Sequence, residues 1–168
     1  MKKLTQEELN QILQQHSLWL ETEGDQGARA DLSRADLSHV QLTDVDLYCA
    51  NLSRANLSHA QLSGAQLTGA DLSHADLSYA QLSGANLSYA DLTRANLRRA
   101  DLTSANLAQA DLTSVSLSGA RISTDTRLHQ CSVFGHLTCS PEALPWLILH
   151  PQWAECKSSV AVVEGSQE

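Results

Sequence analysis

Ring-bearing and cationic side chains recur at one interval in this sequence. His39, His59, Tyr79 and Arg99 are spaced by twenty residues. Two histidines could begin a metal site, but no third ligand follows at the same interval, and zinc needs at least three protein ligands. Tyrosine and arginine are instead typical of residues that dominate the energy of protein interfaces. We therefore take these four as candidate partner-binding residues and expect no metal.

The remaining reactive side chains form no catalytic set. Cys131 and Cys139 are eight residues apart and could pair or bind a metal, but they lack the Cys-x-x-Cys spacing of a zinc site. There is no glycine-rich phosphate loop, His-Glu-x-x-His motif or nucleophile elbow. We expect no enzyme activity and no cofactor. The four cysteines are predicted to be free thiols of a cytosolic protein, and the redox state of Cys131, Cys139 and Cys156 stays open.

The interval of twenty residues is four copies of a shorter repeat. Nineteen pentapeptides of pattern Ala-(Asp/Asn/Gln)-Leu-(Ser/Thr)-X run from Ala30 to Thr124 in one register. The first three residues alternate inward and outward as in a strand, and the last two change the chain direction. Four such sides close a square coil, and the chirality of L-residues favours a right-handed path. Every fourth repeat then shares a face. We number faces one to four from the repeats that begin at Ala30, Ala35, Val40 and Val45, so that face two holds the repeats from Ala35, Ala55, Ala75 and Ala95.

This pattern resembles the pentapeptide-repeat family over Ala30 to Thr124. The resemblance implies an all-β solenoid, the right-handed quadrilateral β-helix of that family, most of whose members have no known biochemical activity. The segments His16-x-x-Trp19-Leu20 and Gly27-Ala28-Arg29-Ala30-Asp31-Leu32 also resemble the start of cyanobacterial members.

Both ends of such a rod expose strand edges and open Leu side chains, so both need caps. Residues 1–29 are predicted to be an N-terminal capping helix and linker, with the helix over 5–22. Thr5 and Glu8 have the spacing of a capping box. Leu9, Ile12, Leu13 and His16 recur at helical spacing. We expect His16 to be a structural histidine on the face that covers the first coil.

The repeat is predicted to end at Thr124. Residues 125–156 should form the C-terminal cap, irregular over 125–139 and with a short helix that begins at Ser140. Its apolar cluster includes Trp146 and Trp153, which are further candidate partner-binding residues. Residues 157–168 are predicted to be a flexible polar tail.

The charge excludes one class of partner. The chain carries a formal charge of -8, so we expect no direct nucleic-acid binding through a basic patch. The repeats hold nine Asp and six Arg. Face one carries a column of Asp71, Asp91 and Asp111, which Arg94 and His74 could offset. We expect no membrane insertion and a cytoplasmic location, because no apolar run approaches the ~20 residues of a span and no signal peptide is evident.

Two functions remain open. The first is a non-enzymatic scaffold or regulatory adaptor that presents flat β-helix faces to a protein partner, as a monomer or two-fold dimer. The second is a DNA-mimicking modulator of type II topoisomerase (gyrase), as in one branch of the resembled family. Mimicry needs an acidic rod, whereas here arginines interrupt the acidic columns.

Overall fold

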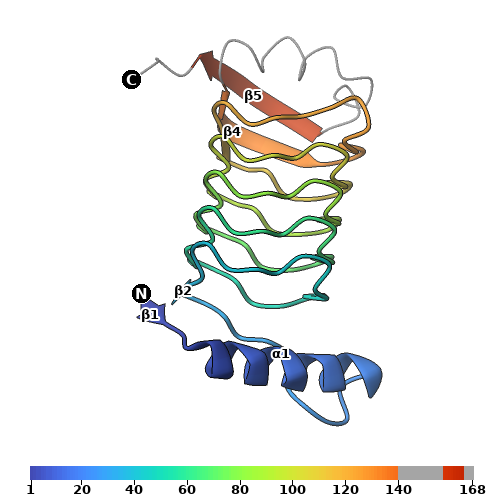
Figure 1. The fold of residues 1–168 in the computed structure, drawn as a ribbon. Helices are drawn as coiled ribbons and strands as arrows, with labels where there is room; N and C mark the ends of the chain where they lie inside the picture. Colours follow the sequence, from blue (N-terminus) through green and yellow to red (C-terminus); the bar gives the residue numbers. More distant parts are fainter. Residues whose placement is uncertain (140–156, 165–168) are drawn as a thin grey trace.

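A stack of four-sided coils forms the body of the protein. The computed structural model describes residues 1–139 and 157–164. Parallel bridges join residues that are twenty apart, such as Asp31 with Asn51 and Asn51 with Asp71. Figure 1 shows the coils stacked into a rod, with one helix lying across the N-terminal end. Four repeats therefore complete one coil, and the predicted β-helix of pentapeptide repeats is confirmed.

Each repeat bends at its last two residues. The carbonyl of the central Leu accepts a hydrogen bond from the amide three residues later, as from Ala55 to Leu52 at 3.0 Å. The residue before that amide adopts a left-handed backbone, with φ of +60° at Arg54. The φ sign matches a type II turn, which needs a positive value at its third residue. The fifth residue of each repeat from Arg34 to Gly119 therefore lies at a left-handed corner of the coil.

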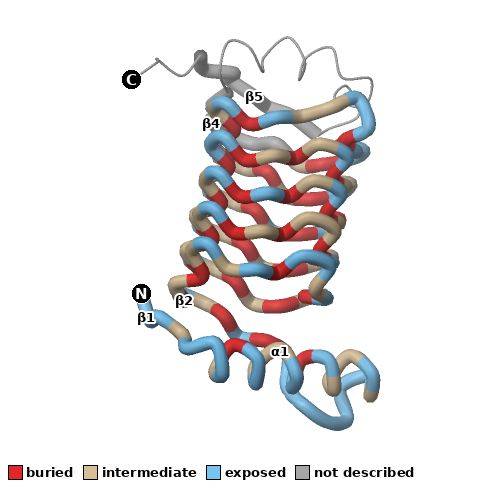
Figure 2. The backbone as a smooth tube through the Cα atoms, in the orientation of Figure 1, coloured by how far each residue is buried: buried red, intermediate tan, exposed pale blue. Residues whose placement is uncertain are grey.

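Leu and Ala fill the inside of the rod. Leu47 through Leu102 at the repeat centres are all 0% exposed, and Figure 2 shows the buried positions alternating with exposed corners along every coil. Burial of one Leu contributes about 1.5–3 kcal/mol before the cost in chain entropy. This interior is the same on all four sides, so it cannot by itself distinguish one face from another.

The predicted N-terminal helix is confirmed. Helix α1 covers Gln6–Glu21, and Thr5 is its N-cap within a complete capping box with Glu8. Leu9 and His16 are the buried residues of the helix. Strand β1 (Lys2–Lys3) pairs in parallel with β2 (Ala35–Asp36). The N-terminal segment thus pairs with part of the open strand edge of the first coil, and α1 covers the Leu side chains of that coil.

The coil continues beyond the predicted end at Thr124. Arg127 bridges to Asn106 and Ser132 to Asp111, at a separation of twenty-one residues instead of twenty. The hydroxyl of Thr126 donates to the carbonyl of Leu102 at 2.8 Å. One inserted residue breaks the five-residue register, so the sequence pattern no longer shows the repeat. Thr126 and Cys131 occupy the buried positions that Ala holds in the other repeats.

Strands also replace the irregular segment and the flexible tail that we expected. Strands β3 (Ser116–Leu117), β4 (Ser132–Cys139) and β5 (Lys157–Glu164) form one parallel sheet in the order β3-β4-β5. The sequence of β5 is rich in Val, which favours strands, and an open coil edge is a template for pairing. The predicted helix from Ser140, with Trp146 and Trp153, lies outside the described residues.

Two of the cysteines differ in redox state. Cys49 is free, as expected. Cys131 is disulfide-bonded, so the prediction of a free thiol is wrong at this residue.

Candidate functional site

The corner between faces two and three carries the residues singled out in the sequence. His39, His59, Tyr79 and Arg99 all have φ between +56° and +60°. The left-handed corner turns each side chain outward, and the coil repeat places the four in one line. All four are exposed, with Tyr79 at 45%. We call this line the ring column.

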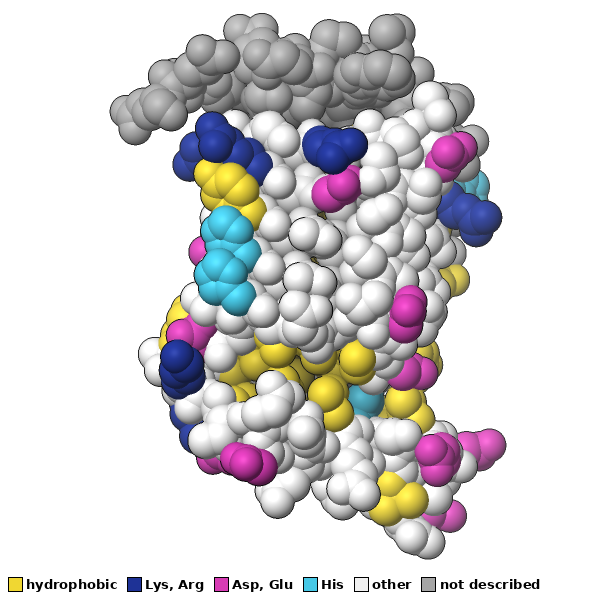
Figure 3. All heavy atoms as spheres, viewed as in Figure 1, with side chains coloured by type: hydrophobic (Ala, Val, Ile, Leu, Met, Phe, Trp, Pro, Cys, Tyr) yellow, Lys and Arg dark blue, Asp and Glu magenta, His cyan; other side chains and the backbone are white. Residues whose placement is uncertain are grey.

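The ring column is a continuous stack. The imidazole centroids of His39 and His59 are 4.8 Å apart with planes at 7°, and His59 lies 4.8 Å from the Tyr79 ring at 8°. The guanidinium carbon of Arg99 lies 5.5 Å from the centre of the Tyr79 ring. Its Nη1 donates a hydrogen bond to the Tyr79 hydroxyl at 2.9 Å. In Figure 3, histidines, a hydrophobic side chain and basic side chains follow one another along one edge of the rod.

Stacking of this kind holds side chains in place. Each cross-strand pair contributes about 0.2–1 kcal/mol, and the guanidinium over a ring adds about 0.5–1 kcal/mol at an exposed site. A partner that contacts the ring column therefore meets planar groups that have already lost much of their rotamer freedom. Among the described residues no group of three or more His, Cys, Asp or Glu could hold a metal ion.

The corner between faces four and one provides a comparison. It carries Cys49, Gly69, Tyr89 and Gln109 at the same repeat position. Tyr89 is 60% exposed, and its hydroxyl accepts a hydrogen bond from Nε2 of Gln109 at 2.8 Å. The backbone and the hydrogen bond match those of Tyr79 and Arg99. This corner lacks both the stacked rings and the positive charge.

Asp and Asn form ladders that the sequence analysis missed. On face two, Asn56 donates to Asp36 at 3.0 Å and Asn96 donates to Asp76 at 2.9 Å. Hydrogen bonds from the Ser38 side chain and backbone are the largest causes that hold the pKa of Asp36 below its ordinary value. The signal was present as an alternation of Asp and Asn at an interval of twenty residues. Its meaning depended on knowing that these residues stack.

The arginines of the repeats do not neutralise the acidic column by direct contact. Within residues that the structure describes, the ion pairs are Lys2 with Glu8 at 3.0 Å and Arg121 with Asp101 at 3.3 Å. Asp91 instead accepts from the backbone amide of Thr93 at 2.8 Å, and Asp111 from that of Thr113 at 2.9 Å. We expected Arg94 and His74 to offset the Asp column, and neither forms such a pair.

The junction between α1 and the first coil holds a buried histidine. Nδ1 of His16 accepts a hydrogen bond from the Ala30 amide at 3.1 Å, and the imidazole stacks on Trp19 at 5.6 Å. Its Nε2 is buried and finds no partner among the described residues. Burial lowers the pKa of His16, while the charge of Asp46 opposes this shift. The predicted position of His16 on the buried face of the helix is confirmed.

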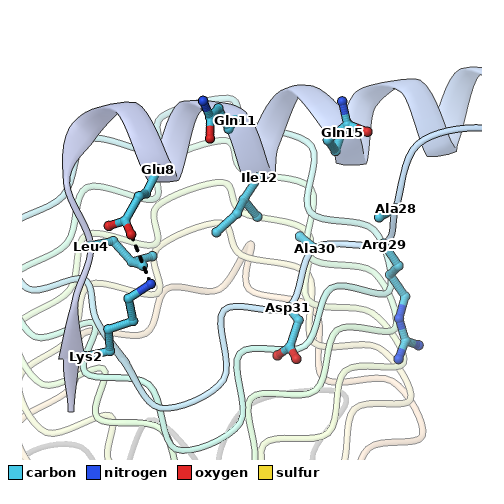
Figure 4. A pocket seen from close by; sticks show the side chains of 10 residues that line it. All are labelled: Lys2, Leu4, Glu8, Gln11, Ile12, Gln15, Ala28, Arg29, Ala30 and Asp31. Carbon is cyan, nitrogen blue, oxygen red and sulfur yellow. Dashed lines mark hydrogen bonds and ion pairs between the residues drawn. The ribbon is translucent and has the colours of Figure 1, made fainter.

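A groove of about 390 Å³ lies beside this junction. Figure 4 shows Leu4 and Ile12 directed from the cap toward the coil, with the Lys2–Glu8 ion pair at one end. Its walls are mainly apolar.

Comparison with known proteins identifies the family. The model of pentapeptide repeats matches eight copies over residues 28–47, 50–88 and 80–119. The chain belongs to the pentapeptide-repeat family. No curated protein matches it.

Two crystal structures of pentapeptide-repeat proteins are similar to this member of the family. Alr5209 from Nostoc Pcc 7120 is 35% identical, over 66% of this chain and 93% of that one, with a TM-score of 0.51. Rfr23 from the cyanobacterium Cyanothece 51142 is 38% identical, over 62% of this chain and 67% of that one, with a TM-score of 0.48. The match to Alr5209 confirms the resemblance to cyanobacterial members.

The described part of this pentapeptide-repeat protein contains no helix that could span a membrane. Its single described helix, α1, is too short and too polar to cross a bilayer.

Proposed function

We propose that this pentapeptide-repeat protein is a non-enzymatic scaffold or regulatory adaptor that binds a protein partner. The observation that carries the proposal is the ring column, a stack of two imidazoles, a phenol and a guanidinium on an otherwise polar wall. Tyr and Arg are enriched among residues that dominate binding energy. Because the stack orders these side chains beforehand, binding costs less side-chain entropy.

The proposal also includes the hand of the coils and the oligomeric state. The coils wind in a right-handed sense, as the chirality of L-residues favours. The protein is a monomer, or a two-fold dimer if Trp146 and Trp153 meet a second copy. The mass in solution of the parent and of Trp153→Ala distinguishes the two states.

A cytoplasmic location without membrane insertion or direct nucleic-acid binding completes the proposal. The net charge of -8 supports the last point. The disulfide at Cys131 is an observation against the compartment, since disulfides are rare in a reducing cytosol. Alkylation of thiols in intact cells, followed by mass analysis of the peptide that contains Cys131, tests the location.

Affinity capture from the native cell tests the function. Tyr79→Ala with Arg99→Ala removes half of the ring column, and we expect the captured partner to be lost. Tyr89→Ala with Gln109→Ala is the matched control, because it removes a tyrosine and its hydrogen-bonded neighbour from the other corner. Equal capture by both double variants and the parent would reject binding through the ring column.

The gyrase hypothesis has its own test. We expect no effect of the protein on DNA supercoiling by gyrase, because arginines line one wall of the rod. Specific inhibition, or protection from a quinolone, would revive the DNA-mimic alternative.

A further inference from the structure

The arginines of the repeats gather on one wall. Face two lies between two corner columns, and these hold five of the six arginines between Ala30 and Thr124. One corner carries Arg34, Arg54, His74 and Arg94, and the other is the ring column, with Arg98 beside Arg99. We call face two with both corners the basic wall. Seven of the nine repeat aspartates lie elsewhere on the rod, so the molecule is polarised although its net charge is negative.

The arginines of the basic wall are not neutralised by carboxylates, although Arg99 donates a hydrogen bond to the Tyr79 hydroxyl. Arg34, Arg54, Arg94, Arg98 and Arg99 are exposed, and none forms an ion pair within the described part of the chain. The only aspartates on this wall are Asp36 and Asp76. Each accepts a hydrogen bond from the Asn of the next coil and from the serine amide two residues on, both through one carboxylate oxygen.

The neighbouring wall limits where an anion can lie. Face one carries Asp31, Asp71, Asp91 and Asp111, and Asp71, Asp91 and Asp111 stack on successive coils. An acidic ligand that moved past Arg54 onto face one would meet this column and be repelled. Face three, on the far side of the ring column, offers only Arg121, which is already paired with Asp101 at 3.3 Å. The charges therefore confine an acidic ligand to the basic wall.

We propose that the basic wall binds an acidic, extended segment of a protein partner, laid along the rod axis. This inference rests on the proposed scaffold function and specifies the chemistry of the partner. Coils are about 4.8 Å apart, so the four coils from Asp36 to Asn96 span about 14 Å, which an extended peptide covers in about five residues. Acidic side chains at alternate positions of such a segment face the corner arginines.

A protein segment fits this wall better than a nucleic acid does. A phosphate backbone carries a charge at every nucleotide and cannot avoid the carboxylates of Asp36 and Asp76 in the middle of the wall. The chain charge of -8 also repels a polyanion. A peptide can place neutral residues over the two aspartates and acids over the arginines.

Fluorescence anisotropy with defined probes tests the inference. The first probe is a labelled peptide of about eight residues that alternates Asp and Ser, longer than the wall at about 3.3 Å per residue. Its counterpart has Asn for Asp, and a labelled single-stranded oligonucleotide represents nucleic acid. We expect the acidic peptide to bind most tightly. Its affinity should fall steeply as salt rises from about 50 to about 300 mM.

Two variants with the same change in net charge locate the site. Arg54→Gln with Arg94→Gln removes two charges from the basic wall, and we expect about tenfold weaker binding of the acidic peptide. Ser104→Glu with Gln109→Glu adds two negative charges at left-handed corners of other walls, and we expect a much smaller effect. Thermal melts confirm that both variants fold.

Each outcome decides the inference. Equal binding of the Asp and Asn peptides, equal loss in both variants, or tighter binding of the oligonucleotide would overturn it. If the acidic peptide fails to bind while Tyr79→Ala with Arg99→Ala still abolishes capture of the cellular partner, the scaffold function stands and only the acidic chemistry is rejected. If the acidic peptide does not bind and the double variant still captures the partner, both the acidic chemistry and binding through the ring column are rejected.

Discussion

Leu77 and Tyr79 belong to one repeat but differ in burial and in the residue types that their positions accept. Leu77 is 0% exposed inside the coil, and Tyr79 is 45% exposed at the corner. The inside position is Leu in every repeat from Leu32 to Leu117, whereas the corner position accepts Arg, His, Asp, Cys, Gly, Tyr, Ser and Gln. Packing therefore restricts the inside position to Leu, whereas the exposed corner accepts side chains of many sizes and charges.

The largest effect should follow from a charge on the inside. Leu77→Asp buries a carboxylate without a partner in the middle of the rod, and we expect loss of cooperative folding, at a cost above about 4 kcal/mol. Gln61→Asp places the same residue on an outer wall between neutral neighbours and should change stability by less than about 0.5 kcal/mol. Thermal unfolding followed by circular dichroism checks both. A Leu77→Asp protein that melts like the parent would contradict the packed interior.

Removal of the N-terminal cap should have the next largest effect. Without residues 1–24, Leu32, Leu37 and Leu42 lose the cover of α1, and the paired edge at Ala35–Asp36 is opened. We expect end-to-end association or precipitation, because exposed strand edges and apolar ends are templates for contact. Light scattering after size-exclusion chromatography measures the mass. A truncated protein that stays monomeric and equally stable would show that α1 is not a cap.

Substitution of one glycine in the cap and one at a corner of the rod compares how tightly the two regions pack. A Cβ at Gly27 would lie 2.3 Å from the Gln15 carbonyl oxygen and 2.7 Å from the Trp19 amide, whereas at Gly84 it would meet nothing within 4 Å. Both residues have positive φ, +73° and +69°. We expect Gly84→Ala to cost about 1 kcal/mol for the backbone alone, and Gly27→Ala to cost more because the cap must shift. Similar melting temperatures for the two variants would contradict tight docking of the cap.

The smallest predicted effect is a dependence on pH. Burial lowers the pKa of His16 from its ordinary value of 6.5, so the neutral imidazole is favoured in the folded protein. Its contribution to stability is complete above pH 6.5 and is lost as the pH falls through the lowered folded value. His16→Asn should keep an acceptor for the Ala30 amide without titrating. Melting temperatures at about pH 7.5 and 5.5 should therefore differ more for the parent than for this variant, and equal differences would contradict the role of His16.

The regular part of the molecule could be predicted because every repeat has the same pattern of buried and exposed residue types. Thr5 with Glu8 predicted the start of α1, and the interval of twenty residues predicted that His39 lies next to His59. The continuation through Thr126 and Cys131 was missed because one added residue shifts the register. Strand β5 was missed because its pairing partner β4 is distant in the sequence, and local pattern does not reveal non-local pairing.

The sequence by itself determined the coil, since a Leu every five residues has one way to be buried on all four sides. It also determined which side chains share a corner. Only the tertiary structure decided how these side chains meet. It showed that the imidazoles stack, that Asn residues rather than arginines contact the aspartates of face two, and that the arginines of the basic wall stay unpaired. These outcomes depend on side-chain distances across neighbouring coils, and a linear pattern contains no distances.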